Sequence, residues 1–245
     1  MTGSTRAVVL LSGGLDSATT LALARARGRT VVAVTFAYGQ RHDLELRCAR
    51  AQARAQGVAR HHVIDLFTFG SIVAPATSLL RASPHSVPRE DPTGGIPNTY
   101  VPARNTLFLA YGLAVAEAAS ATEIWIGANA VDYSGYPDCR PDFLEAFERV
   151  ANLGTKAGRA APDGRGIRIE APLLTQTKAQ IVALGLELGV DFAQTFSCYD
   201  PVGDDPPVAC GVCPSCRIRL AGFARARHPD PLPYASRPGN TSNTS

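Results

Sequence analysis

The chain has 245 residues, of which 45% are hydrophobic and 18% are charged, values typical of a globular protein that can bury one α/β core. Its formal net charge is only +3, which argues against binding nucleic acid or anionic membranes through bulk charge. The apolar runs are shorter than a membrane-spanning helix requires and the N-terminus lacks the layout of a signal peptide, so we predict a cytoplasmic protein without membrane contact.

Strand-like and helical patterns alternate along the chain. Strands are predicted at residues 6–11, 30–36, 61–65, 123–127 and 167–170. Helices are predicted at residues 17–28, 42–56, 105–120, 142–153 and 177–188. This alternation predicts an α/β fold with a doubly wound parallel five-stranded sheet of Rossmann-like type. Ligands of such sheets bind at the carboxyl ends of the strands.

The first strand ends in a glycine turn (residues 12–17), after which a helix begins near Asp16 and Ser17. Gly13 and Gly14 can adopt positive φ, and the free N–H groups of the turn and of the helix N-terminus form a cradle for an anion. Ser12 and Ser17 add hydroxyl donors, and Asp16 is suited to hold a Mg²⁺ ion that bridges phosphate oxygens. The turn lacks the lysine of a Walker A loop. The alternative is a turn that only joins a strand to a helix.

Two polar clusters follow further along the chain. Residues 81–103 are rich in Pro, Gly and Ser and predict a long loop, after which Arg104 stands at a helix entry and is suited to bind a phosphate or a carboxylate. A surface arginine is the ordinary alternative. The loop after the fourth strand carries many hydrogen-bonding side chains, and a purely structural turn is the alternative there. Its candidates for substrate contact are Asp132, Tyr136, Asp138 and Arg140.

Four cysteines near the C-terminus have the spacing C-x11-C-x2-C-x2-C. Two overlapping C-x-x-C steps bring thiolates together, and four thiolates suit a closed structural Zn²⁺ site. A disulfide pair and an iron–sulfur cluster are the alternatives. The proposed zinc ligands are Cys198, Cys210, Cys213 and Cys216.

The chain is therefore predicted to have three parts. Residues 1–190 form the nucleotide-binding α/β domain, and residues 191–228 form a zinc-binding C-terminal subdomain. Residues 229–245 are predicted to be a flexible tail, because they are rich in Pro, Gly, Asn, Thr and Ser.

The motifs occur in an order that resembles the 7-cyano-7-deazaguanine synthase family of the PP-loop ATP pyrophosphatase superfamily. They are the glycine turn, FAYGQRH at residues 36–42, VPARN at residues 101–105, DYSGYPDCR at residues 132–140, and the four cysteines. The resemblance covers about residues 5 to 228. It implies a PP-loop fold and the ATP-dependent conversion of 7-carboxy-7-deazaguanine and ammonia to 7-cyano-7-deazaguanine. Adenylation of the carboxylate, amide formation and dehydration to the nitrile are the implied steps, with Mg²⁺ and a structural zinc.

The resemblance also assigns roles to individual residues. Asp16, Lys178 and Arg104 are the implied catalytic residues, and the four cysteines are the implied zinc ligands. An exposed helix lysine is the alternative for Lys178. The ATP segment comprises Leu11, Ser12, Gly13, Gly14, Leu15, Asp16, Ser17, Ala18, Thr19, Thr20 and Leu21. Paired carboxylates after the fourth strand suit the N1–H and exocyclic amine of a guanine-like ring.

Other functions stay open at this point. A relative could stop at the amide or use another carboxylate. A tRNA-thiolating PP-loop enzyme is disfavoured, because the cysteines look saturated by metal and no RNA-binding domain is visible, so we expect no direct nucleic-acid partner. A zinc-stabilised nucleotide-binding module without catalysis is the third alternative. The sequence leaves the assembly open, a homodimer included.

Overall fold

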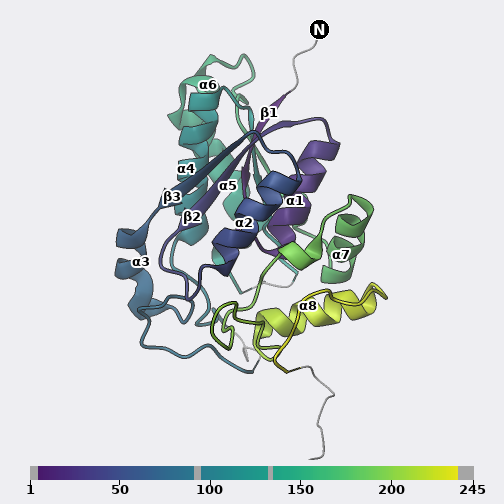
Figure 1. Ribbon diagram of the computed structural model, residues 1–245. Coiled ribbons are helices and arrows are strands. Elements are labelled where there is room, and N and C mark those ends of the chain that lie inside the picture. The colour runs from purple at the N-terminus through teal and green to yellow at the C-terminus, as the bar shows by residue number, and fades with distance from the viewer. Residues whose placement is uncertain (1–4, 91–94, 132–134, 237–245) are drawn as a thin grey trace, which may run out of the picture.

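Five strands form one fully parallel sheet in the computed structural model, which describes residues 5–90, 95–131 and 135–236 (Figure 1). The strands are β1 (Arg6–Leu10), β2 (Thr30–Ala37), β3 (Arg60–Asp65), β4 (Glu123–Ile126) and β5 (Arg168–Glu170). Their order in the sheet is β3-β2-β1-β4-β5, and every neighbouring pair is parallel. The chain leaves β1 toward one edge and later returns to its other side, so the order reverses between β1 and β4. This confirms the predicted doubly wound α/β fold.

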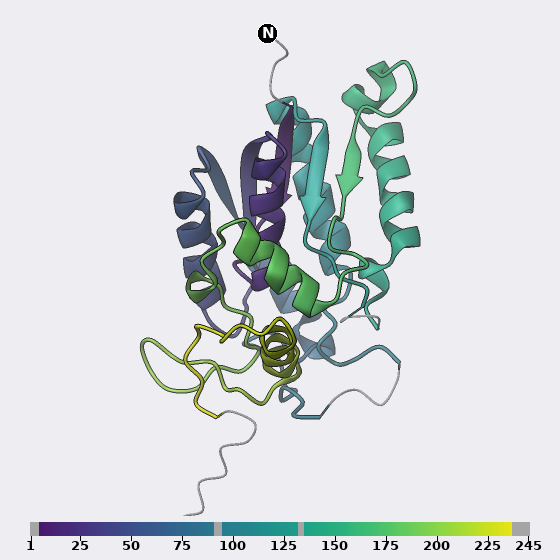
Figure 2. The same ribbon diagram turned by 90° about the vertical axis from the view of Figure 1, so that its right-hand side faces the viewer.

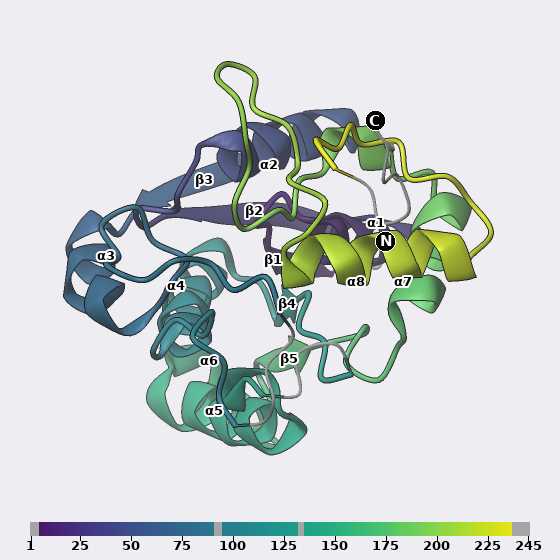
Figure 3. The same ribbon diagram turned by 90° about the horizontal axis from the view of Figure 1, so that it is seen from below.

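Helices cover both faces of the sheet, as the view from below shows (Figure 3). One face carries α1 (Leu15–Ala26) and α2 (Leu44–Ala55), whose buried side chains pack with Ala7, Val9 and Trp125. The opposite face carries α4 (Arg104–Ala119) and α5 (Pro141–Gly154) over Val8 and Leu10. Alternate residues of β1 therefore pack into the two cores on opposite faces of the sheet. Because both faces of the strand are buried, its sequence is a continuous apolar run.

Shorter elements gather around this layered core. Figures 1 and 2 show α7 beside α1 and α8 beyond the carboxyl ends of the strands. These remaining helices are α3 (Phe67–Val73), α6 (Lys156–Ala160), α7 (Lys178–Glu187) and α8 (Pro214–Arg225). Short 3₁₀ turns occupy Ala74–Ala76, Pro137–Cys139 and Phe192–Gln194. Residues 81–90 and 95–103 contain no helix or strand, in agreement with the predicted long loop.

The sequence pattern misses α3, α6 and α8. Helix α3 has seven residues with a glycine inside, and a Cβ at Gly70 would lie 1.9 Å from the Tyr38 carbonyl oxygen, so close packing and not propensity places this helix. Helix α8 begins directly after a cysteine of the cluster. Its Pro214 at the first position is a helix-start signal that the sequence does offer.

The ordered C-terminal part continues beyond the boundary that the sequence suggests at residue 228. Asp230 and Leu232 are buried, and Asp230 binds Arg219 of α8 at 2.8 and 3.0 Å. The backbone N–H of Ala235 donates to the Ala209 carbonyl at 2.9 Å. Residues 229–236 therefore pack with the preceding segment, while residues 237–245 of the predicted tail lie outside the described residues. Among the residues that are described, no helix has both the length and the apolar character to cross a membrane.

Candidate functional site

The glycine turn lies between β1 and α1, as predicted, and Ser17 closes it from within. The Ser17 hydroxyl accepts from the N–H groups of Ser12 and Gly13, both at 3.2 Å, and donates to the Gly14 carbonyl at 3.0 Å. Only Gly13 adopts a positive φ, of 91°, whereas Gly14 is the N-cap of α1 at φ −80°. The first-turn N–H groups of α1 have no acceptors within the helix, so they are the anion-facing donors of the turn.

Gly13 is required by a close contact with α2. A Cβ at this position would lie 2.1 Å from the Glu45 carbonyl oxygen and 2.7 Å from the Ala49 nitrogen. No other residue fits there without moving the helix. The first turn of α2 thus lies directly against the glycine turn.

Asp16 and Lys178 form an ion pair across 162 residues of sequence. The Lys178 ammonium lies 2.6 and 2.8 Å from the two carboxylate oxygens of Asp16. Lys178 is the first residue of α7 and is 7% exposed, which excludes the alternative of a solvent-exposed helix lysine. Thr177 and Gln180 form a capping box that fixes this helix start. The two predicted catalytic residues therefore lie together.

Arg104 begins α4 and lines the same cavity as the glycine turn. The residue before it, Ala103, has φ 54°, a left-handed conformation that is rare for alanine, and its N–H donates to the Tyr100 hydroxyl at 3.1 Å. Burial alone would lower the pKa of Arg104, but the electrostatic effects of Tyr38, Tyr136 and Asp138 outweigh it and raise that pKa. Arg104 is therefore a fixed positive charge within the cavity and not a surface arginine.

The loop after β4 divides between the cavity and the scaffold. Tyr136 is 4% exposed, lines the cavity and donates to the Thr99 hydroxyl at 2.7 Å. Asp138 is also buried, but its Oδ2 accepts from the backbone N–H of Asn105 at 2.9 Å, at the N-terminus of α4. Arg140 is exposed and precedes α5. Asp138 is bound at a helix start and neither Asp138 nor Arg140 is among the residues that line the cavity, so their contact with the substrate stays a prediction.

Asp132, the fourth candidate of this loop, lies outside the described residues. The neighbouring Cys139 does line the cavity, and burial raises its pKa to about 11. Its sulfur accepts from the Asn105 side-chain amide at 3.3 Å. Cys139 is therefore a neutral thiol near neutral pH.

One cavity at the carboxyl ends of β1, β2 and β4 joins these parts. It is the place where the strand order reverses, as expected for a doubly wound sheet. Its polar lining residues are Ser12, Asp16, Ser17, Tyr38, Gln40, Glu45, Arg104, Asn105, Asn129, Tyr136, Ser197, Tyr199 and Ser215. Of the predicted ATP segment, Leu11, Ser12, Gly14, Leu15, Asp16 and Ser17 line it, whereas residues 18–21 are buried within α1.

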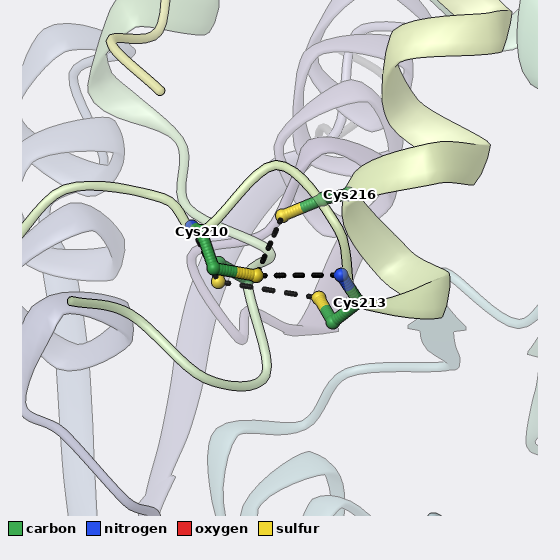
Figure 4. A group of neighbouring side chains, drawn as sticks. Cys210, Cys213 and Cys216 are labelled. Carbon is green, nitrogen blue, oxygen red and sulfur yellow. Dashed lines mark hydrogen bonds between the residues drawn. The ribbon is translucent and has the colours of Figure 1, made fainter. Parts of the chain in front are cut away.

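The four cysteines lie together, as predicted, and three of them are labelled in Figure 4. All four sulfurs lie within 4.8 Å of one another, and the Cys198–Cys213 and Cys210–Cys216 pairs are each 4.0 Å apart. A disulfide needs about 2 Å between sulfurs, so these distances exclude one. Tetrahedral Zn²⁺ with bonds of about 2.3 Å places its sulfurs about 3.8 Å apart, which these distances fit.

Backbone N–H groups support the sulfurs. The N–H groups of Cys210 and Asp200 donate to the Cys198 sulfur at 3.3 and 3.4 Å. Those of Cys213 and Val212 donate to the Cys210 sulfur at 3.3 and 3.5 Å. Such donors stabilise thiolates, so a metal ion bound by four thiolates fits the site.

Residues 195–236, here called the cysteine segment, also contact the glycine turn directly. The Phe196 N–H donates to the Gly13 carbonyl at 3.0 Å, and Ser197, Tyr199 and Ser215 line the cavity. Helix α8 packs on Lys178 so closely that a Cβ at Gly222 would lie 2.4 Å from the lysine Cγ. The cysteine cluster therefore stabilises one wall of the cavity.

Sequence reasoning missed several lining residues, Glu45, Phe108 and Tyr199 among them. Glu45 follows the FAYGQRH motif by three residues, and this proximity is the signal in the sequence that could have identified it as a site residue. Phe108 lies one turn after Arg104, on the same side of α4. Tyr199 follows the first cysteine of the cluster, and only the contact of the cysteine segment with the glycine turn brings it to the cavity.

Comparison with known proteins gives a consistent result. The family model of queuosine biosynthesis protein QueC matches residues 6–227. A 7-cyano-7-deazaguanine synthase of Paramagnetospirillum magneticum is 53% identical over 238 residues, which cover 94% of this chain and 99% of that protein. Enzymes of the same name from Ectopseudomonas mendocina and Geobacter metallireducens are 54% and 51% identical, each across 94% of this chain and across 98% and 94% of their own.

Proposed function

The chain belongs to the QueC family of queuosine biosynthesis proteins, and from this premise we propose that it makes 7-cyano-7-deazaguanine from 7-carboxy-7-deazaguanine, ATP and ammonia. One observation carries the proposal. A single cavity is lined by the glycine turn, the end of β2, the start of α4, the loop after β4 and the cysteine segment. Each segment that carries the family resemblance thus contributes to the same site.

The reaction requires two activations. A carboxylate oxygen attacks the α-phosphorus of ATP and releases pyrophosphate, and ammonia then displaces AMP to give the amide. A second ATP adenylates the amide oxygen, and loss of AMP and of the remaining N–H protons gives the nitrile. The glycine turn would hold the pyrophosphate part, because its helix N-terminus presents unpaired N–H donors. Arg104 would stabilise negative charge on the adenylate.

Asp16 and Lys178 form the charged pair of the site. Asp16 is the carboxylate of the glycine turn that would hold Mg²⁺, which supplies charge neutralisation to the phosphates when bound. Lys178 holds that carboxylate in place through two hydrogen bonds and would pair with phosphate oxygens once ATP is present. Tyr136, which lines the cavity, is the substrate candidate that this geometry favours, and Asp132, Asp138 and Arg140 remain predictions.

The zinc site is structural in this proposal. The thiolates of Cys198, Cys210, Cys213 and Cys216 would fill its four positions and leave none open for water or substrate. The remaining predictions are a cytoplasmic location and action on small molecules without direct nucleic-acid contact. The assembly stays open, a homodimer included.

Product analysis tests the proposal. The protein is incubated with 7-carboxy-7-deazaguanine, MgATP and an ammonium salt, and the products are identified by mass spectrometry and nucleotide chromatography. We expect the nitrile together with AMP and pyrophosphate, and Asp16→Asn should lose most of the activity while exposed Glu187→Gln keeps it. Formation of ADP and phosphate alone, or of the amide as the final product, would contradict the proposal.

A further inference from the structure

Glu45 is an acidic residue that lines the cavity. Among the described residues, no arginine, lysine or histidine forms an ion pair with its carboxylate. The acidic residues in the described lining are Asp16 and Glu45, and Asp16 is bound by Lys178. The Glu45 carboxylate makes no hydrogen bond or ion pair with another residue of the part of the chain that the structure describes. Asp138, the carboxylate that the sequence assigns to the substrate ring, is bound at the start of α4.

The surroundings of Glu45 are fixed by three elements. It lies in the first turn of α2, and its carbonyl oxygen touches Gly13 of the glycine turn. His42 before α2 and Arg104 of α4 act on its carboxyl, and that carboxyl in turn acts on Tyr38 at the end of β2 and on Cys48 of α2. Burial raises the pKa of Glu45, and the charges of His42 and Arg104 oppose that shift. A partly buried carboxylate without hydrogen-bond donors is unfavourable, and a ligand with N–H groups would supply them.

We propose that Glu45 recognises the amino-pyrimidinone edge of the substrate by accepting hydrogen bonds from its ring N1–H and its exocyclic amine. The inference rests on the proposed function, since it concerns the deazaguanine ring of that reaction. Two adjacent, parallel N–H donors match the two oxygens of a carboxylate, as a guanidinium does. The adenine of ATP presents a donor beside an acceptor nitrogen on the corresponding edge, so a carboxylate is mismatched to it. Glu45 would therefore distinguish the ring to be modified from the base of the nucleotide.

Aromatic side chains make this part of the cavity apolar. Phe36 and Phe108 stack with ring centroids 4.0 Å apart, and Tyr38 meets Phe108 edge-on at 5.4 Å. All three line the cavity together with Glu45. A hydrogen bond to a charged group is stronger in such surroundings than in water. A planar ring with a polar edge fits this combination of flat apolar walls and one carboxylate.

A helix-stabilising role is the alternative for Glu45, because acidic residues in a first turn favour the helix dipole. The two roles differ in their response to the ligand. Recognition couples Glu45 to the exocyclic amine of the substrate, whereas a structural role affects all ligands alike. A cycle that changes both the protein and the ligand therefore separates them.

The experiment measures dissociation constants by calorimetry for wild type, Glu45→Ala, Glu45→Gln and the exposed control Glu187→Gln. The ligands are 7-carboxy-7-deazaguanine, the same compound without its exocyclic amine, and a non-hydrolysable ATP analogue. We expect wild type and Glu187→Gln to bind the amine-bearing ligand about 30-fold more tightly or better. In Glu45→Ala that preference should fall to about threefold or less, while the affinity for the ATP analogue stays within about twofold.

Several outcomes would overturn the inference. One is an undiminished preference for the amine in both Glu45 variants. Another is an equal loss of affinity for all three ligands, which would indicate a structural role. Unchanged substrate binding with lost turnover would assign Glu45 to chemistry instead. Nitrile formation by wild type tests the proposed function separately, so either conclusion can fail alone.

Discussion

The glycine turn and the cysteine segment meet at one cavity but are held in place by different means. The turn is attached to β1 and α1, whose Val9 and Leu21 are fully buried in the core between the sheet and helices α1 and α2. The cysteine segment contributes no strand to the five-stranded sheet. It depends on four sulfurs and on the buried side chain of Arg219 in α8, which binds Thr195 and Asp230 of the same segment. The glycine turn is therefore stabilised by apolar burial, whereas the cysteine segment is stabilised by polar and metal-binding groups.

This difference implies two units of different stability. Apolar surface buried between strands and helices stabilises the sheet without any metal. The cysteine segment has a smaller apolar cluster, in which the four cysteines themselves are buried. We therefore expect the cysteine segment to open while the sheet stays folded, and activity to need both.

Cys213→Ser should give the largest effect. It removes one of four ligands from a site type whose apparent zinc-binding free energy is about 10–16 kcal/mol in small domains. We expect loss of zinc, loss of amide protection in residues 195–236, and loss of nitrile formation. Protection in β1 and β2 should persist. Elemental analysis and hydrogen exchange measure these changes.

Cys48→Ser is the matched control for this prediction. Cys48 packs at the edge of the same apolar cluster but is not among the four converging sulfurs. It should keep the zinc and the protection of the cysteine segment. Full zinc content in Cys213→Ser, or equal loss of protection in β1, would contradict the separation of the two units.

Arg219→Met should destabilise the cysteine segment by about 3–5 kcal/mol, because it leaves Asp230 buried without its counter-charge. The guanidinium binds Asp230 at 2.8 and 3.0 Å, the Thr195 hydroxyl at 2.8 Å and the Phe192 carbonyl at 3.1 Å. Hydrogen exchange of residues 228–236 measures the loss. Arg225→Met, an exposed change in the same helix, should have little effect. Adding Asp230→Leu should recover part of the stability.

The sequence predicts features that depend on neighbours along the chain. β1, the glycine turn and α1 follow from one apolar run, two glycines and a helical pattern within residues 6–26. The cysteine cluster follows from spacing alone, because the thiolates of C-x-x-C steps converge. These local signals are sufficient to predict the fold class and the two parts of the cavity wall formed by the glycine turn and the cysteine segment.

The remaining features depend on partners distant in sequence. Asp138 accepts from the Asn105 N–H of α4, which lies 33 residues earlier in the chain. The ion-pair partner of Lys178 is Asp16, 162 residues earlier. Glu45 becomes a cavity residue only because Gly13 lets α2 approach the turn. A single sequence contains no signal for such pairings, so side-chain roles in the loop after β4 could not be predicted.

Asp138→Ala tests whether that carboxylate supports α4 or contacts the substrate. It leaves the buried Asn105 N–H without an acceptor, so we expect the free energy of unfolding to fall by about 1–3 kcal/mol. Activity should fall as well, because Arg104 begins the same helix. Arg140→Ala changes an exposed side chain and should alter stability by less than about 0.5 kcal/mol. Denaturant unfolding checks both variants. A stable Asp138→Ala protein with weakened substrate binding would support the predicted contact with the substrate ring.

Glu123→Gln should give the smallest effect, and it probes the sheet at the end opposite to the cavity. Glu123 begins β4, is fully buried, and accepts from Arg29 at 2.8 and 3.0 Å and from the Trp125 indole at 2.9 Å. Burial would raise the pKa of Glu123, but these hydrogen bonds and the charges of Arg29 and Arg168 lower it on balance. Since the partner arginines are partly exposed, Glu123→Gln should lower the free energy of unfolding by about 1 kcal/mol at neutral pH.

The pH dependence of that difference follows from the lowered pKa. A group whose pKa is lower in the folded state contributes its full stability above its unfolded value of about 4.3, and loses it as the pH falls through the folded value. The stability gap between wild type and Glu123→Gln should therefore be constant above about pH 5 and shrink in stronger acid. Trp125, the only tryptophan, reports unfolding of the sheet by fluorescence. Titrations of the cysteine segment occur in both proteins and cancel in the difference. A gap that persists in strong acid would show that the charge of Glu123 does not stabilise the sheet, which would then rest on apolar burial alone.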